Sequence, residues 1–124
     1  MSQDIVADAL NQIMNARRAG KKELELKRFS KLLLSVLAIA KLNKYVKNYK
    51  TNGTILKIEI GPIHGCLAIK PRKMGGKNQI EKYVKRYLPA KNIGLIIIST
   101  SKGLMTHVTA MEKNIGGSLI AYIY

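Results

Sequence analysis

The sequence predicts a mixed α/β (α+β) fold, on three observations. Segments with helical periodicity alternate along the chain with segments of strand-like alternation or short apolar runs. Hydrophobic residues make up 47% of the 124 residues, which is enough for a packed core. Residues 71–78 combine Pro, Gly and charge, a composition typical of a linker between subdomains. The chain therefore forms one compact domain or two small subdomains that share a core.

The first part of the chain predicts two helices with a strand between them. Apolar residues recur at helical spacing near the start, so we expect a helix over residues 4–19. Residues 22–27 alternate polar and apolar side chains, which is typical of a half-buried strand. Ser30 is a favourable N-cap for a second helix over residues 31–43, and the leucine-rich middle of that helix indicates burial on most sides.

Three strands are expected next. Residues 45–50 and 54–60 predict paired strands around a turn at Asn52-Gly53, because Asn-Gly favours a tight hairpin turn. Every second residue of the later strand is apolar and would face inward, namely Leu56, Ile58 and Ile60. A further strand is expected over residues 66–70, ending before a proline.

The following segment predicts a helix, a strand and a loop. A helix that contains Ile80 and Val84 is expected to stop at Pro89. The apolar run over residues 93–98 predicts a strand. Residues 99–103 are expected to form a loop, because they are small and hydroxylated and end in glycine.

The end of the chain predicts a short helix and a last strand. Thr106 is a suitable N-cap for a helix that reaches Lys113, and Asn114 suits the left-handed conformation after it. Gly116-Gly117 is expected to break the chain before a strand over residues 118–124.

The charge of the chain indicates a polyanionic partner. The 22 Lys and Arg residues exceed the 7 Asp and Glu residues, which gives a formal net charge of +15. A folded protein with this charge binds most favourably to nucleic acid or to an anionic membrane surface. Residues 21–50 hold nine basic and two acidic residues, whereas residues 92–124 have a net charge of only +1. A nucleic-acid contact by the C-terminal part would therefore depend on hydrogen bonds more than on charge.

Several classes of protein are excluded by composition. The single cysteine, Cys66, cannot form an internal disulfide. The longest apolar run, residues 32–40, is shorter than the roughly 20 residues that a membrane-spanning helix needs. The first residues do not resemble a secretory signal. We therefore expect a cytoplasmic protein.

The C-terminal half resembles a known family, the small-subunit ribosomal protein eight family. The similarity lies in residues 97–107, in Gly116-Gly117 and in the apolar and aromatic residues 119–124. Residues 68–72 and 85–90 are similar to the archaeal and eukaryotic branch of that family. Matches near the N-terminus extend the resemblance over nearly the whole chain.

This resemblance implies a fold and a function. It implies two α/β subdomains that share an interface, over residues 1–72 and 73–124, and a structural, non-enzymatic role without cofactor or metal. The protein would be a monomer before assembly and would bind the central domain of small-subunit rRNA early, supporting platform assembly. Its partners would be that rRNA, neighbouring small-subunit proteins and, as in some relatives, its own mRNA, with no membrane.

The resemblance also implies an RNA-binding site. Residues 99–103 would meet an irregular rRNA helix in its minor groove, and basic residues elsewhere would contact phosphates. The residues assigned to RNA binding are Ser99, Thr100, Ser101, Lys102, Gly103, Lys21, Lys22, Lys70, Arg72, Asn114, Gly116 and Gly117. The chain departs from the usual family residues at Val108, Thr109 and Ser118, the last of which replaces a glutamate found in many bacterial members.

The chemistry of the predicted loop suits RNA. The minor groove of an RNA helix is wide and shallow and displays 2′-hydroxyl groups. Ser and Thr hydroxyls both donate and accept hydrogen bonds, so they can pair with these groups and with base edges. Gly103 permits close approach of the backbone, and Lys102 can reach a phosphate.

Other interpretations of these residues are weaker. Ser99 and Lys102 have the spacing of a serine–lysine acyl-transfer pair, but the further motifs of such enzymes are absent. His64, Cys66 and His107 do not have the spacing of a zinc site. The remaining alternative is a basic module that binds nucleic acid or an anionic membrane by charge alone.

Tyrosines offer a second mode of RNA binding. Tyr45, Tyr49, Tyr83 and Tyr87 could stack on bases, but tyrosine at helix or strand spacing is more often a core residue with a solvated hydroxyl. We therefore expect these rings in the core.

Overall fold

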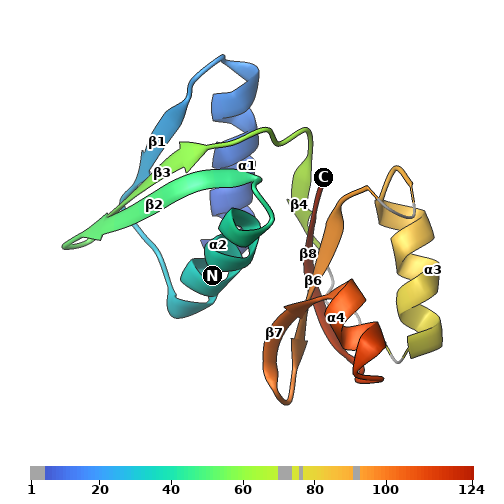
Figure 1. Ribbon diagram of the computed structural model, residues 1–124. Helices are drawn as coiled ribbons and strands as arrows, with labels where there is room; N and C mark the ends of the chain where they lie inside the picture. Colours follow the sequence, from blue (N-terminus) through green and yellow to red (C-terminus); the bar gives the residue numbers. More distant parts are fainter. Residues whose placement is uncertain (1–4, 70–73, 76, 91–92) are drawn as a thin grey trace. The chain divides into compact units, whose positions relative to one another are not determined.

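The computed structural model describes residues 5–69, 74–75, 77–90 and 93–124, and this chain contains both helices and strands (Figure 1). The predicted mixed α+β fold class is confirmed. The chain divides into two compact units, Met1–Cys66 and Leu67–Tyr124, which we call the N-terminal and C-terminal units. The predicted subdomain boundary between residues 72 and 73 lies outside the described residues.

The N-terminal unit combines two helices with a three-stranded antiparallel sheet. Its elements are α1 (Ile5–Arg18), β1 (Glu23–Leu26), α2 (Lys31–Leu42), β2 (Val46–Asn52) and β3 (Ile55–Ile60). The strand order is β1-β3-β2. The predicted alternation of β3 is confirmed, because Leu56, Ile58 and Ile60 are buried whereas the residues between them are exposed.

The second helix begins where the sequence predicts. The hydroxyl of Ser30 accepts a hydrogen bond from the Leu33 backbone N–H at 3.2 Å, as an N-cap does. The predicted burial on most sides is confirmed only in part: Leu33, Val36, Leu37 and Ala40 are buried, and Leu42 at the end of the helix is 82% exposed. Leu32, Leu34 and Ile39 are half-buried. A helix in a small layered unit buries one stripe most deeply and exposes the opposite side.

The hairpin between β2 and β3 is shifted by one residue from its predicted turn. Asn52 still pairs with Ile55, so Gly53 and Thr54 form the turn in place of Asn52-Gly53. Gly53 has a φ of 64°, and glycine in the first turn position adopts such a φ without steric cost. The paired strands are confirmed, and the choice of turn residues follows from their register.

The C-terminal unit contains a five-stranded sheet and two helices. Its elements are β4 (Cys66–Ala68), β5 (Met74–Gly75), α3 (Lys77–Tyr87), β6 (Leu95–Thr100), β7 (Gly103–Thr106), α4 (His107–Glu112) and β8 (Gly117–Ile123). The strand order is β4-β8-β6-β7, and β5 also pairs with β8. Part of the predicted linker over residues 71–78 is therefore regular structure, since it contains β5 and the start of α3.

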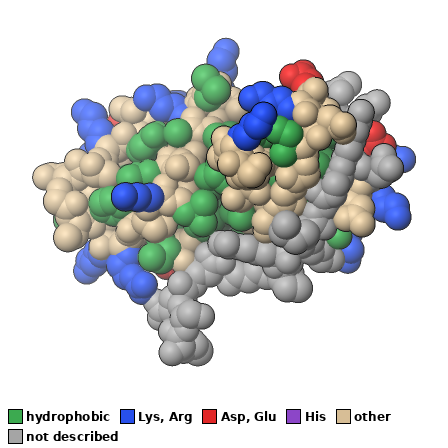
Figure 2. Space-filling view, turned by 90° about the horizontal axis from the view of Figure 1, so that it is seen from below, with side chains coloured by type: hydrophobic (Ala, Val, Ile, Leu, Met, Phe, Trp, Pro, Cys, Tyr) green, Lys and Arg blue, Asp and Glu red, His purple; other side chains and the backbone are tan. Residues whose placement is uncertain are grey.

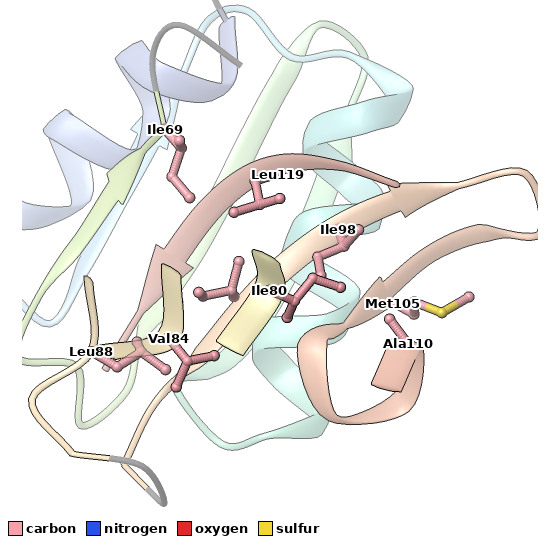
Figure 3. Packing of buried hydrophobic residues seen from close by; sticks show 9 residues of the cluster. Ile69, Ile80, Val84, Leu88, Ile98, Met105, Ala110 and Leu119 are labelled. Atoms are coloured by element: carbon pink, nitrogen blue, oxygen red, sulfur yellow. The ribbon is translucent and has the colours of Figure 1, made fainter. Parts of the chain in front are cut away.

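The two helices of this unit pack on one face of the sheet. The core cluster joins Ile80 and Val84 of α3, Leu88 directly after that helix and Ala110 of α4 to Ile96, Ile98, Met105 and Leu119 of the strands and to Ile69 (Figure 3). The predicted helix ahead of Pro89 is confirmed. Burial of this apolar surface is the main force that holds the hairpin of β6 and β7 in place.

Two local predictions near the C-terminus are confirmed, and a third is wrong by one residue. Thr106 caps α4 by accepting a hydrogen bond from the Thr109 N–H at 3.3 Å. Asn114 has a φ of 54°, the left-handed conformation expected after the helix. The predicted break at Gly116-Gly117 is wrong for Gly117, which is the first residue of β8.

Candidate nucleic-acid interface

The predicted loop over residues 99–103 is the tip of a β-hairpin. Ser99 and Thr100 belong to β6, and Gly103 begins β7, a strand that the sequence did not predict. Thr100 pairs with Gly103, so only Ser101 and Lys102 form the turn. The local composition resembles a loop, but the sheet satisfies the backbone hydrogen bonds of these residues, because Ser99 pairs with both β7 and β8. Both turn side chains are exposed.

The hydroxyl of Thr100 holds the turn together. Its Oγ1 donates to the Gly103 carbonyl at 2.8 Å and accepts from the Lys102 N–H at 3.1 Å. The one hydroxyl proton of Thr100 is therefore used inside the protein. Among the described residues, Ser101 has no hydrogen-bond partner for its hydroxyl, so this side chain is the one at the tip that can both donate to and accept from a ligand.

A second pair of hydroxyls lies below the tip. Ser99 is the register partner of Ser118 on β8 and of Leu104 on β7. Register partners point to the same face of a sheet, and the adjacent Ile98 points to the helices. Ser99 and Ser118 therefore lie side by side on the face opposite α3 and α4, where both are half-buried.

Gly117 allows two backbones to approach each other. A Cβ on this residue would lie 2.3 Å from the Ser99 carbonyl oxygen and 2.9 Å from Cγ2 of Ile98. Gly117 also pairs with Gly75 of β5. Its role is therefore to bring β8 against the base of the hairpin. Gly116 precedes it and is exposed.

The predicted basic contacts lie in a turn of the N-terminal unit. Lys21 and Lys22 follow Gly20, whose φ of 77° ends α1, and both lysine side chains are exposed. Arg17, in contrast, donates from Nε to the Ile63 carbonyl and is half-buried, so it supports the fold. The other two predicted basic residues, Lys70 and Arg72, lie outside the described residues.

The positive charge of this part of the chain is exposed. All nine basic residues of the segment 21–50 are exposed. Lys57 Nζ forms an ion pair with Glu23 Oε2, at 3.6 Å. On the face drawn in Figure 2, Lys and Arg side chains are scattered widely and Asp and Glu are few. The protein therefore presents charge that phosphates can neutralise.

The tyrosines of the C-terminal unit pack on one another. The ring of Tyr87 lies 6.1 Å from that of Tyr83 and 5.3 Å from that of Tyr122, and Tyr122 stacks on Tyr124 at 6.1 Å. All four are partly buried against the core cluster. The core interpretation is therefore confirmed for Tyr83 and Tyr87. Tyr45 and Tyr49 of the N-terminal unit are half-buried.

His107 has a place that the sequence did not indicate. It is 4% exposed, and its Nδ1 accepts a hydrogen bond from the Ile96 N–H at 3.1 Å. Burial lowers the pKa of this imidazole from its ordinary value. The one sequence feature that indicates a fixed position for His107 is that it directly follows Thr106, the predicted N-cap of a helix. No group of three His, Cys, Asp or Glu suited to a metal occurs in the described part of the chain.

Comparison with known proteins adds an independent finding. The family model described as ribosomal protein S8 matches residues 4–124. The "Small ribosomal subunit protein uS8" of Nanoarchaeum equitans (strain Kin4-M) is 44% identical over 129 aligned residues, which cover 100% of both chains. No helix within the described residues has the length and apolar character needed to cross a membrane. The similarity extends over both units.

Proposed function

Because the chain belongs to the ribosomal protein S8 family, and is thus a structural protein of the small ribosomal subunit rather than an enzyme, we propose that it binds the central domain of the small-subunit rRNA through the turn between β6 and β7. Ribosomal RNA binding is typical of the family, and the alternative of a non-ribosomal basic module has no support in the comparisons. The proposal concerns which RNA is bound and which residues bind it.

The observation that carries the proposal is the form of the hairpin tip. Ser101 and Lys102 are exposed on a turn that Thr100 holds with two hydrogen bonds. A narrow, rigid tip with a free hydroxyl matches a shallow minor groove lined by 2′-hydroxyls. Lys102 is placed next to that hydroxyl, where it can contact a phosphate at the groove edge.

The two units are assigned different parts of the binding. Hydrogen bonds to 2′-hydroxyls or base edges come from three serines, Ser99, Ser101 and Ser118. The backbone around them is shaped by Thr100, Gly103, Asn114, Gly116 and Gly117. Lys21 and Lys22 contact phosphates, and we extend this role to Lys70 and Arg72 on the sequence alone. Phosphate contacts give affinity and salt dependence, and hydroxyl contacts give selectivity for RNA shape.

The proposal has two consequences for the cell. A tip that recognises an irregular helix would hold that helix in one shape and so support assembly of the platform. A messenger RNA with the same irregular helix would be bound by the same residues, which would allow the protein to bind its own mRNA.

The test is the substitution Ser101→Ala. We expect affinity for a central-domain rRNA fragment to fall by about 2- to 13-fold, which corresponds to one hydrogen bond of about 0.5–1.5 kcal/mol. The slope of affinity against salt should stay the same, because no charge is removed. The matched control is Ser35→Ala, since Ser35 is an exposed serine on α2, and we expect it to leave affinity unchanged.

A competition assay accompanies the substitution. The wild-type protein should prefer the fragment over a duplex RNA of equal length by at least about a hundredfold, at two salt concentrations. Equal affinity for the two RNAs, or an unchanged affinity and footprint in Ser101→Ala, would show that the tip does not read RNA shape.

A further inference from the structure

A groove of about 620 Å³ lies in the C-terminal unit between α3 and α4. Of the residues assigned to RNA binding, none of the described ones lines it. Its volume is within the range of about 300–1,000 Å³ that is usual for binding pockets. The groove is therefore large enough for a few side chains of a bound segment, and the RNA contact does not explain it.

The walls of the groove are apolar. Val84 of α3 and Leu88, directly after that helix, contribute from one side, and both also belong to the core cluster. Val108 and Met111 contribute from α4, and Val108 is 53% exposed. A phosphate backbone gains nothing from such walls, whereas an apolar side chain that entered the groove would remove Val108 from water.

The rim of the groove is acidic, in contrast to the rest of the chain. Glu81 and Glu112 line it, and they are two of only 7 acidic residues in a chain of net charge +15. Neither carboxylate forms an ion pair with any described residue. Lys85 also lines the groove, which leaves a net charge of one negative. RNA therefore gains less at this position than on the basic surface of the chain, whereas a basic segment can pair with the two carboxylates.

The groove also contains one directed polar group. His107 lines it and is 4% exposed. Because Nδ1 accepts the Ile96 N–H, the proton of the neutral ring is on Nε2. No described residue accepts a hydrogen bond from that Nε2–H. It therefore remains available to a carbonyl oxygen of a bound peptide.

We propose that this groove binds a basic segment of a second protein of the small subunit. Apolar side chains of the segment enter between α3 and α4, and its Lys or Arg side chains pair with Glu81 and Glu112. Proteins that share an rRNA surface carry Lys and Arg to neutralise phosphates, so a neighbour in the same particle has the required charge. The inference rests on membership of the family and is independent of the proposed RNA contact at Ser101.

The test places a photoreactive group in the groove. The variant Val108→p-benzoyl-phenylalanine is assembled into small subunits and irradiated, and the cross-linked product is identified by mass spectrometry. We expect a cross-link to a protein segment that contains Lys or Arg beside large apolar residues. Adding Glu81→Lys and Glu112→Lys should lower the yield, per copy incorporated, at least fivefold.

A matched control distinguishes the effect of the charge change itself from the effect of its position in the groove. The pair Glu25→Lys and Glu59→Lys makes the same charge change at exposed residues of the N-terminal unit, and we expect it to leave the yield unchanged. A cross-link to rRNA, no cross-link, or a protein cross-link that ignores the reversal at Glu81 and Glu112 would overturn the proposal. The rRNA affinity of each variant is measured separately, so a failure of the RNA proposal is recognised on its own.

A second measurement needs no substitution. Hydroxyl-radical oxidation of Met111 is compared in the free protein, in its complex with rRNA alone, and in the complete subunit. We expect Met111 to be oxidised at the same rate in the first two and at least fivefold more slowly in the subunit. Protection by rRNA alone, or equal oxidation in all three, would contradict a protein partner.

Discussion

The side chain of His107 links β6 to α4 through a single hydrogen bond. Its Nδ1 accepts the Ile96 N–H at 3.1 Å within the core of the C-terminal unit. Protonation of Nδ1 would remove that acceptor and leave a buried N–H without a partner, which costs about 1–3 kcal/mol. Burial also disfavours the charged ring, so the pKa of His107 lies below its ordinary value of 6.5.

This lowered pKa predicts the pH dependence of stability. In the unfolded chain His107 takes up a proton near pH 6.5, whereas in the folded chain it stays neutral to a lower pH. The contribution of His107 to the free energy of unfolding is therefore complete above that pH and is lost as the pH falls below it. We expect the free energy of unfolding, measured in urea at pH 7, 6 and 5, to fall more steeply in the wild type than in His107→Asn. His64→Asn, at an exposed histidine, should retain the steep fall. Equal pH profiles of wild type and His107→Asn would refute the assignment.

At the scale of elements, the β6–β7 hairpin joins a core strand to the candidate RNA contact. Ile98 and Met105 pair within the core cluster, and Thr100 pairs with Gly103 two residues nearer the tip. The geometry of the tip therefore depends on burial at the base of the hairpin and on the Thr100 hydroxyl at its end. A rigid tip binds RNA with a smaller loss of conformational entropy than a mobile loop does.

The prediction at this scale concerns Thr100→Val. The variant keeps the shape of the side chain but loses the hydrogen bonds to the Gly103 carbonyl and from the Lys102 N–H. We expect a loss of stability of about 0.5–1.5 kcal/mol, faster hydrogen exchange of the Lys102 amide, and weaker binding to the rRNA fragment. Thr100→Ser retains the hydroxyl and should behave nearly as the wild type does. Unchanged exchange in Thr100→Val would show that the hydroxyl does not hold the turn.

At the scale of the whole molecule, the exposed charge and the candidate hydroxyl contacts belong to different parts of the sequence. Nine exposed basic residues lie within positions 21–50, in the N-terminal unit. The hairpin tip and its hydroxyls belong to the C-terminal unit, and residues 92–124 carry a net charge of only +1. Salt dependence and RNA selectivity should therefore respond to different substitutions.

We predict that the pair Lys21→Ala and Lys22→Ala flattens the salt dependence of rRNA binding. Each lost phosphate contact should reduce the slope of log K against log salt by about 0.7–0.9. The preference for the rRNA fragment over a matched duplex should change little. Lys57→Ala is the control, because Lys57 already pairs with Glu23 at 3.6 Å and should contribute less to the slope. A slope equal to that of the wild type in the double variant would exclude both lysines as phosphate contacts.

Much of the local structure could be predicted from the sequence. The caps at Ser30 and Thr106, the left-handed Asn114 and the alternation of β3 all appear as expected. Each depends on interactions within about four residues, and these are encoded in the identity and spacing of neighbouring side chains. The overall charge and the family resemblance are likewise properties of the sequence, and they indicated RNA as the partner before any fold was known.

Strand pairing and its register set the features that the sequence left open or predicted wrongly. Ser99 is a strand residue because it pairs with Ser118 and Leu104, and the turn at Gly53 follows from the register of β2 on β3. At the candidate site, too, the sequence predicted some features and only the fold decided others. The residues of the tip were named from the sequence, but only the fold shows that Thr100 uses its hydroxyl internally while Ser101 keeps its own free. Ser99 and Ser118 meet only when the sheet forms, and the register of each hairpin selects its turn residues, so these features cannot be derived from local composition.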